Sequence, residues 1–231
     1  MERILLPMGS YENILYQLGK WKIVNLKDLC KMMTNQVGYK GLSKRVKKLE
    51  EQGFVSSIIT HDNSKYLYLT NKGVTMASGG VSYDKLEEIL NHDLKCSLVL
   101  RELLKYKNFI DGQMLDDRSD GISPDAKIIA TKNNSEYVLA LELEINQKSK
   151  DRIKEKFKKY SSNNTYPYVL YVFQKPEVMY AYTQILEGMS EEIQKKIICL
   201  LDAKLSIFKF DYETATCFFK GKLREFENIF G

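Results

Sequence analysis

The segment Ser123–Ile145 constrains the fold more than any other part of the chain, because it combines a tight turn with a strict alternation of residue types. Asn133-Asn134 suits a two-residue hairpin turn, since asparagine tolerates positive φ angles. A hairpin that turns there places Asp125 opposite Glu142, and the period of two places Glu144 on the same face. The sequence therefore predicts two antiparallel strands that carry three acids on one face.

Three acids on one sheet face repel one another unless a counter-charge compensates them. A divalent cation would turn this repulsion into binding, because hard cations such as Mg²⁺ prefer carboxylate oxygens, and Mn²⁺ shares this preference. Mg²⁺ or Mn²⁺ is therefore one cofactor that this face could bind. The alternative is a solvated face on which Glu142 or Glu144 pairs with a lysine.

Size and composition indicate a packed globular protein. The chain has 231 residues, of which 44% are hydrophobic, enough for one large or two small domains. The four cysteines are far apart and there are two histidines, so neither a zinc site nor a disulfide framework is expected. Because no apolar run approaches membrane-spanning length, we expect a cytoplasmic protein without a membrane partner.

Residues 11–76 show the pattern of three helices followed by two strands. Asn25 suits the cap of the second helix, and Gly53 ends the third as a C′ glycine. In the third helix the apolar residues recur at i, i+4 and i+7 and predict a buried stripe: Leu42, Val46 and Leu49. The opposite side carries four polar residues: Lys40, Ser43, Lys44 and Lys47.

This order of elements is the plan of a winged helix-turn-helix. Val46–Val55, followed by a wing and Leu69–Gly73, resembles winged-helix regulators. The resemblance implies that the third helix enters the major groove of double-stranded DNA while the wing touches the backbone. The alternative is a winged helix used for protein contacts or for a homodimer.

The glycine-containing stretch Ala77–Val81 predicts a linker between two domains, residues 1–80 and 81–231. In the second domain the patterns predict a helix, the hairpin, a basic helix, a strand, a helix and two strands. Their ranges are 83–106, 124–145, 147–160, 168–173, 178–201, 205–210 and 214–219. This order favours a mixed sheet flanked by helices, so that the chain belongs to the α/β (α+β) two-domain class.

Pro124-Asp125 and Glu142-Leu143-Glu144 resemble the signature of the PD-(D/E)XK nucleases, which implies a restriction-endonuclease-like second domain. The resemblance implies that Asp125 and Glu142 hold Mg²⁺. The family normally has lysine where this chain has Glu144. Glu144 could therefore act as the base, and Lys127 or Lys148 could supply the positive charge.

The arrangement as a whole resembles the replication-relaxation family, which includes mobilisation relaxases. The likeness extends to about Phe173 and rests on the winged helix, Asn91–Leu94, Ser123–Ala126 and Ala140–Ser149. It implies nicking of, or origin-specific binding to, plasmid or mobile-element DNA. Two functions stay open: a metal-dependent nicking endonuclease, and a non-catalytic regulator of replication or transcription with a degenerate nuclease domain.

The helix predicted after the hairpin is strongly basic, with seven basic residues in the fourteen positions 147–160. Ser149 suits its cap, and its apolar spacing predicts a buried stripe: Ile153, Phe157 and Tyr160. Lys150 and Lys154 could hold DNA phosphates beside the acids, and the alternative is a solvated helix face. His92, in the helix before the hairpin, could shuttle protons or approach the metal, and the alternative is a surface or capping role.

Overall fold

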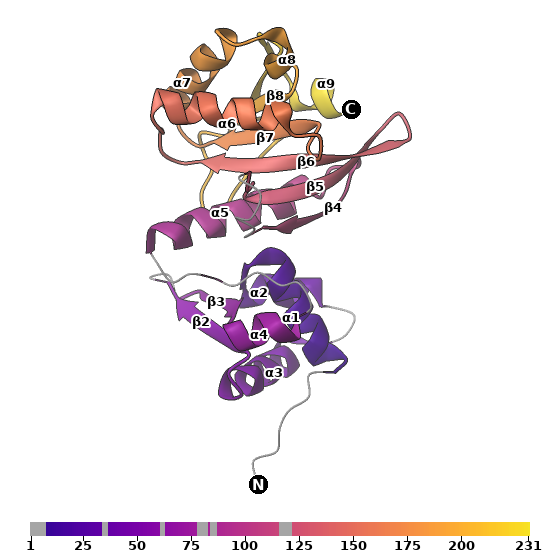
Figure 1. Ribbon diagram of the computed structural model, residues 1–231. Coiled ribbons are helices and arrows are strands. Elements are labelled where there is room, and N and C mark those ends of the chain that lie inside the picture. Colours follow the sequence, from indigo (N-terminus) through magenta and orange to yellow (C-terminus); the bar gives the residue numbers. More distant parts are fainter. Residues whose placement is uncertain (1–7, 34–36, 61–62, 78–82, 84–86, 116–121) are drawn as a thin grey trace. The chain divides into compact units, whose positions relative to one another are not determined.

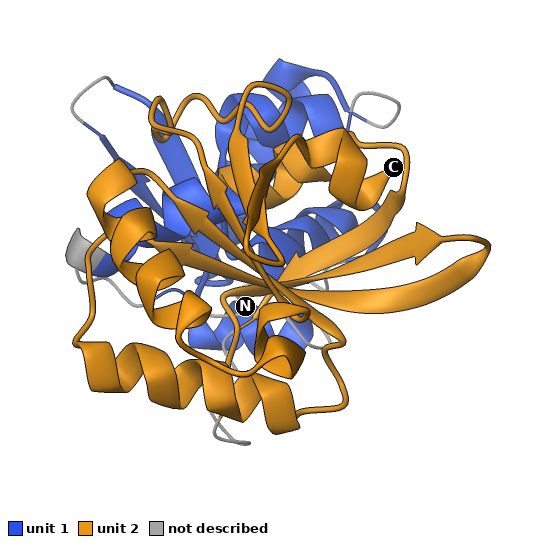
Figure 2. Ribbon diagram, turned by 90° about the horizontal axis from the view of Figure 1, so that it is seen from above, with its two compact units in different colours: residues 1–97 blue, residues 98–231 orange. Residues whose placement is uncertain are grey.

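The computed structural model describes residues 8–33, 37–60, 63–77, 83, 87–115 and 122–231. The chain divides into two compact units, Met1–Ser97 and Leu98–Gly231 (Figure 2). The division falls inside α5 (Glu87–Leu103). Most of the predicted linker, residues 78–81, lies outside the described residues, and a domain boundary between residues 80 and 81 stays a prediction.

The first unit contains the predicted three helices and strand pair, with one further strand and one further helix (Figure 1). Its strands form an antiparallel sheet in the order β1-β3-β2. The elements are α1 (Ser10–Trp21), β1 (Ile23–Asn25), α2 (Leu26–Met32), α3 (Tyr39–Glu51), β2 (Val55–Ile59), β3 (Lys65–Leu69) and α4 (Asn71–Met76).

Local sequence signals set the helix ends of this unit. The Asn25 side chain accepts the backbone N–H of Lys27 at 2.8 Å and so caps α2. Gly53 has a φ of +72°, a conformation that glycine adopts without strain, and it terminates α3. The buried residues of α3 are the predicted stripe of Leu42, Val46 and Leu49. These three predictions are confirmed.

The first part of α5 is fastened to the first unit by buried polar contacts. The ammonium of Lys22 lies 3.0 Å from the carboxylate of Asp93, and both side chains are buried. One turn further along, the hydroxyl of Ser97 donates to the carbonyl of Ile23 at 3.1 Å. These contacts place residues 93 and 97 with the first unit, as the division after Ser97 does.

The second unit is built on a seven-stranded mixed sheet in the order β10-β9-β8-β7-β6-β5-β4. The neighbours β6, β7 and β8 are parallel, and the other pairs are antiparallel. The strands are β4 (Phe109–Met114), β5 (Ala126–Lys132), β6 (Ser135–Glu144), β7 (Tyr168–Phe173), β8 (Ile197–Leu201), β9 (Thr216–Phe219) and β10 (Lys222–Arg224). The remaining helices are α6 (Lys150–Ser162), α7 (Pro176–Glu187), α8 (Glu191–Gln194) and α9 (Phe226–Phe230).

The helices α6 and α7 cover one face of this sheet (Figure 1). Their buried side chains pack with those of β7 into one core that includes Ile153, Phe157, Tyr160, Val169, Tyr171, Phe173 and Tyr182. The strands β7 and β8 are nearly continuous apolar runs, as parallel strands with both faces covered tend to be. The predicted mixed sheet flanked by helices is thus present, and so is the predicted buried stripe of α6.

The hairpin of β5 and β6 has the predicted turn and register. Asn133 and Asn134 have φ angles of 51° and 61°. The cross-strand pairs are Ala126–Leu141, Lys127–Ala140, Ile128–Leu139, Ile129–Val138, Ala130–Tyr137, Thr131–Glu136 and Lys132–Ser135. Asp125 directly precedes this ladder, at the end of the hairpin where Glu142 and Glu144 lie.

Two of the predicted elements are wrong. Residues 178–201 are not one helix, because α7 ends at Glu187 and Ile197–Leu201 forms β8. A short apolar run fits a buried strand as well as a helix, and pairing with β7 decides this one. Residues 205–210 contain no strand, because the carboxylate of Asp202 accepts the N–H groups of Lys204 and Asp211 at 2.8 and 2.9 Å and closes a loop. The sequence patterns also missed β4, β10 and α9.

Candidate functional site

Three carboxylates meet at the end of the hairpin, as the sequence predicts. Glu142 and Glu144 lie two residues apart on β6 and are only 2% and 3% exposed. Asp125 lies beside them, because its Oδ2 accepts the backbone N–H of Leu143 at 2.8 Å. The predicted grouping of the three acids is therefore present in the structure.

The face that carries these acids is covered by α6, so the alternative of a solvated face does not hold. The ammonium of Lys156 lies 2.7 Å from Oε2 of Glu142 and 4.0 Å from Oε1 of Glu144. The hydroxyl of Tyr160 donates a short hydrogen bond to the other oxygen of Glu142. Both carboxylate oxygens of Glu142 are thus engaged by one helix. Pairing of Glu142 with a lysine, which the sequence left open, is what the structure shows.

Lys156 is the residue that sequence reasoning missed. Of the two predicted lysines, Lys148 lies 3.9 Å from the carboxylate of Glu144 and pairs with it, whereas no ion pair of Lys127 is found within the described ranges. A signal for Lys156 existed in the spacing of α6, because it precedes Tyr160 by one turn and so borders the buried stripe. The sequence did not show that this side of α6 packs against β6, the strand that carries Glu142.

Burial dominates the electrostatics of the cluster. It raises the pKa of Glu142 to about 7, against the opposing attraction of Lys156, and nearby Asp125 adds to the rise. Burial likewise raises the pKa of Glu144. Burial disfavours the charge of Lys156, but the combined field of Glu142, Asp125 and Glu144 outweighs it, so the pKa of Lys156 is raised. Lys156 therefore stays charged beside Glu142, and Lys148 adds a second positive charge near Glu144.

The arrangement does not fit a divalent cation as it stands. Among the described residues, no three His, Cys, Asp or Glu side chains are placed so as to hold a metal ion together. The predicted ligand Glu142 has both oxygens taken by Lys156 and Tyr160. A cation bound to Asp125 and Glu142 would need these contacts to open, so a metal site there stays a proposal.

A pocket of about 290 Å³ opens beside Glu144. Its basic lining residues are Lys148, Arg152, Lys156 and Lys159, and its wall includes Ile122, Ser123, Tyr171 and Tyr182. The hydroxyl of Tyr171 is buried and has no hydrogen-bond partner within the described part of the chain. The lining also includes Glu144 and Glu155, and Lys148, Lys156 and Lys159 each form an ion pair with an acid. Arg152 and the hydroxyl of Tyr171 are the groups that suit an anion with several acceptor oxygens, such as a phosphate.

The predicted phosphate-binding lysines of α6 lie elsewhere on the helix. Lys150 is exposed and Lys154 is half-buried, and neither lines the pocket. The lining residues Arg152, Lys156 and Lys159 recur at helical spacing, which places them on a different side from Lys150 and Lys154. The basic run thus identified α6 as the helix beside the acids. It did not identify which side of α6 faces them.

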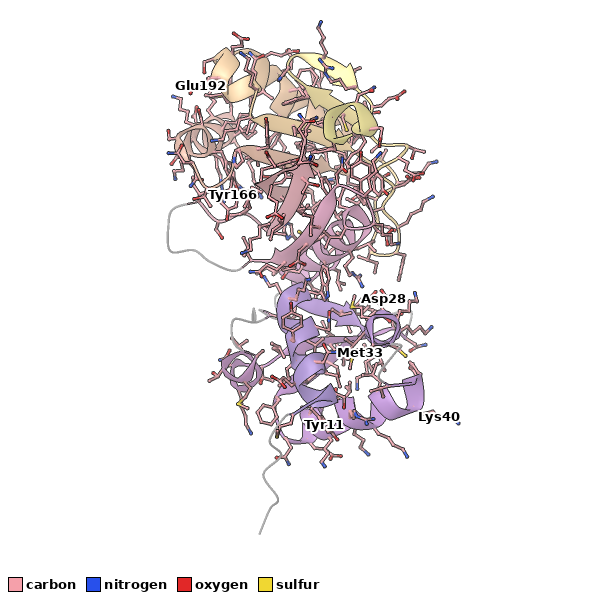
Figure 3. The ribbon with its side chains drawn as sticks, turned by 90° about the vertical axis from the view of Figure 1, so that its right-hand side faces the viewer. Tyr11, Asp28, Met33, Lys40, Tyr166 and Glu192 are labelled. Carbon is pink, nitrogen blue, oxygen red and sulfur yellow. The ribbon has the colours of Figure 1, made fainter. Side chains whose placement is uncertain are left out.

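The helix α3 presents its predicted polar face. Lys40, Ser43, Lys44 and Lys47 are all exposed. Figure 3 shows Lys40 at the outside of the unit, and the ammonium of Lys47 lies 3.9 Å from the carboxylate of the exposed Glu51. Such a face is available to a partner, and its role in DNA binding stays a prediction at this point.

His92 belongs to the first unit, on α5. Its Nδ1 lies 3.4 Å from Oδ1 of Asp93, the acid that pairs with Lys22. A contact with the neighbouring residue does not indicate catalysis. A catalytic role of His92 stays a prediction. No helix in the described ranges is long and apolar enough to cross a membrane.

No family model matches this chain, and no curated protein matches it. Two solved structures resemble it. The adhesin competence repressor AdcR from Streptococcus pyogenes is 21% identical, with a TM-score of 0.28 over 42% of this chain and 66% of that chain. Restriction endonuclease FokI is 9% identical, with a TM-score of 0.29 over 76% of this chain and 39% of that chain. Both superpositions are too loose to bear on function, which rests on the residues of this chain.

Proposed function

We propose that this protein binds double-stranded DNA with α3 in the major groove. The observation that carries the proposal is the exposed polar face of α3, formed by Lys40, Ser43, Lys44 and Lys47 opposite a buried stripe. Lysines on an exposed helix face neutralise backbone phosphates, and serine donates hydrogen bonds to phosphates or base edges. In helix-turn-helix proteins the helix in this position lies in the major groove.

The second unit contributes by holding a backbone phosphate in the pocket beside α6. The pocket combines four cationic side chains with the buried hydroxyl of Tyr171, which lacks a partner within the described residues. A phosphate would supply acceptors to the Tyr171 hydroxyl and to the cations of the wall, and its charge would offset that of Arg152 above all, because Lys156 is held by Glu142.

The test is the binding of a fluorescent DNA duplex to the wild type and to a variant with Lys40, Lys44 and Lys47 replaced by glutamine. Fluorescence anisotropy measures the dissociation constant. We expect binding by the wild type and a large loss in the variant, because three phosphate contacts disappear. Equal affinity of the two proteins would place the DNA interface away from α3 and overturn the proposal.

Metal-dependent nicking of DNA is a second candidate function. It is favoured by the grouping of Asp125, Glu142 and Glu144 beside a pocket that fits a phosphate. The test is incubation of supercoiled plasmid with protein and Mg²⁺ or Mn²⁺, with an Asp125→Ala variant as control. Nicking that the variant loses supports the enzyme. Intact DNA binding without nicking supports the non-catalytic regulator, which the engagement of both Glu142 oxygens favours.

The resemblance to the replication-relaxation family supports a role in plasmid or mobile-element replication or mobilisation. In that role the DNA target is an origin, and competition between origin and random duplexes measures the preference. A homodimer and a cytoplasmic location stay predictions.

A further inference from the structure

We propose that Lys156 is the resident counter-ion of the carboxylate cluster and excludes divalent cations from it. Lys156 is a positioning residue in this proposal, since it fixes the carboxylate of Glu142 rather than acting on a substrate. The proposal deepens the proposed function, because it concerns the control of the same site.

The geometry engages both carboxylate oxygens of Glu142. The Lys156 ammonium contacts Oε2 at 2.7 Å, and the Tyr160 hydroxyl contacts Oε1. Tyr160 is fully buried in the core under α6, so its hydroxyl is held in place by packing. A divalent cation on Glu142 would have to replace the ammonium, because two cations cannot share one buried carboxylate without strong repulsion.

The ammonium is also within reach of Glu144, at 4.0 Å from Oε1. One side chain from α6 thus stands between both buried acids of β6. In the sequence the third signature position holds Glu144 in place of lysine. A positive charge lies beside the acids nevertheless, because Lys156 of α6 supplies it. Lys156 pairs with Glu142, the acid that was predicted to bind the metal.

Removing the ammonium while keeping the volume of the side chain should open the cluster to a cation. Lys156→Met does this, since methionine is unbranched and adaptable. Without the Lys156 ammonium, Oε2 of Glu142 loses its cation, and a hard metal ion can take that position. The exposed Lys158, on the same helix and outside the pocket, offers a matched control as Lys158→Met.

The experiment is titration of each protein with Mn²⁺ at about pH 8, above the raised pKa of Glu142, so that the acid is ionised. The electron paramagnetic resonance signal of free Mn²⁺ reports binding. We expect Lys156→Met to bind one Mn²⁺ at least about tenfold more tightly than the wild type and Lys158→Met. The gain should vanish in the double variant Lys156→Met/Glu142→Gln.

Two results would overturn the proposal: no gain in Mn²⁺ affinity of Lys156→Met over the wild type, or a gain that survives Glu142→Gln. Lys156→Gln replaces Lys156→Met if circular dichroism shows that the latter does not fold. DNA affinity is measured on the same proteins. If the wild type does not bind DNA but Lys156→Met gains Mn²⁺ affinity, only the proposed function is refuted. If the wild type binds DNA but Lys156→Met gains no Mn²⁺ affinity, only the exclusion by Lys156 is refuted.

Discussion

The helices α3 and α6 share one sequence pattern but differ in what their cations do. Both bury residues spaced at i, i+4 and i+7, and both are rich in lysine on the remaining surface. On α3 the lysines of the predicted face are exposed, whereas on α6 Lys156 is drawn into a buried acid pair at 2.7 Å. The difference arises from the neighbour, because α6 packs on a strand that carries Glu142 and Glu144. A basic helix therefore acquires its role from the surface that it covers.

The largest expected effect lies on α3. Replacing Lys40, Lys44 and Lys47 by glutamine should weaken duplex binding about a hundredfold at low salt and flatten the salt dependence by about three units of slope, because each lost phosphate contact removes about one. Anisotropy titrations across a salt series measure both. A control with Lys195, Lys209 and Lys222 replaced has the same net charge, and these exposed lysines lie outside α3. Equal losses in the two variants would mean that only overall charge matters.

The next effect concerns the stability of the acid pair under α6. Glu142→Ala leaves the Lys156 ammonium and the Tyr160 hydroxyl without their acceptor. The free energy of unfolding should fall by about 2 kcal/mol, below the range for a fully buried pair because Lys156 reaches solvent. Urea denaturation measures the change. Neutralising the exposed Lys44 on α3 should change the free energy of unfolding by less than about 0.5 kcal/mol. If Lys44 and Glu142 substitutions destabilised the protein equally, the charges of α3 and α6 would not differ in their contribution to stability.

The pH dependence of stability should distinguish the two helices further. The pKa of Glu142 is raised by burial to about 7, above the ordinary value of an unfolded glutamate. The folded state therefore holds more protons than the unfolded state between these values, and this contribution to stability is lost as pH rises through 7. Between about pH 6 and pH 8 the loss should be about 1 kcal/mol. Urea denaturation at a series of pH values measures this loss. Glu142→Gln should abolish the dependence of the unfolding free energy on pH in this range, and an unchanged dependence would mean that another group causes it.

The smallest effect separates the two sides of α6. Arg152→Gln removes a cation from the pocket wall and should weaken DNA binding about threefold, with a salt slope smaller by about one. Lys150→Gln, on an exposed position outside the pocket, should leave the affinity nearly unchanged. Equal effects of the two substitutions would show that α6 acts as a general basic surface and that the pocket holds no phosphate.

Much of the fold could be predicted because its signals are local. The Asn25 cap, the terminating Gly53 and the Asn133-Asn134 turn depend on residues close in sequence, and the turn alone fixes the register that brings Asp125 to the end of β6. The strand β8 could not be separated from a helix in the same way, because a short apolar run lacks a distinguishing period and its pairing with β7 is a long-range choice.

The sequence by itself thus determined the order of the elements, the hairpin register and the grouping of three acids, since turn chemistry and periodicity act within a few residues. Only the tertiary structure decided what balances those acids. Lys156 reaches Glu142 because α6 crosses β6 at one particular place, and which of seven basic residues faces inward depends on that packing. Charge along a helix is written in the sequence, but the partner of each charge is set by the surface against which the helix lies.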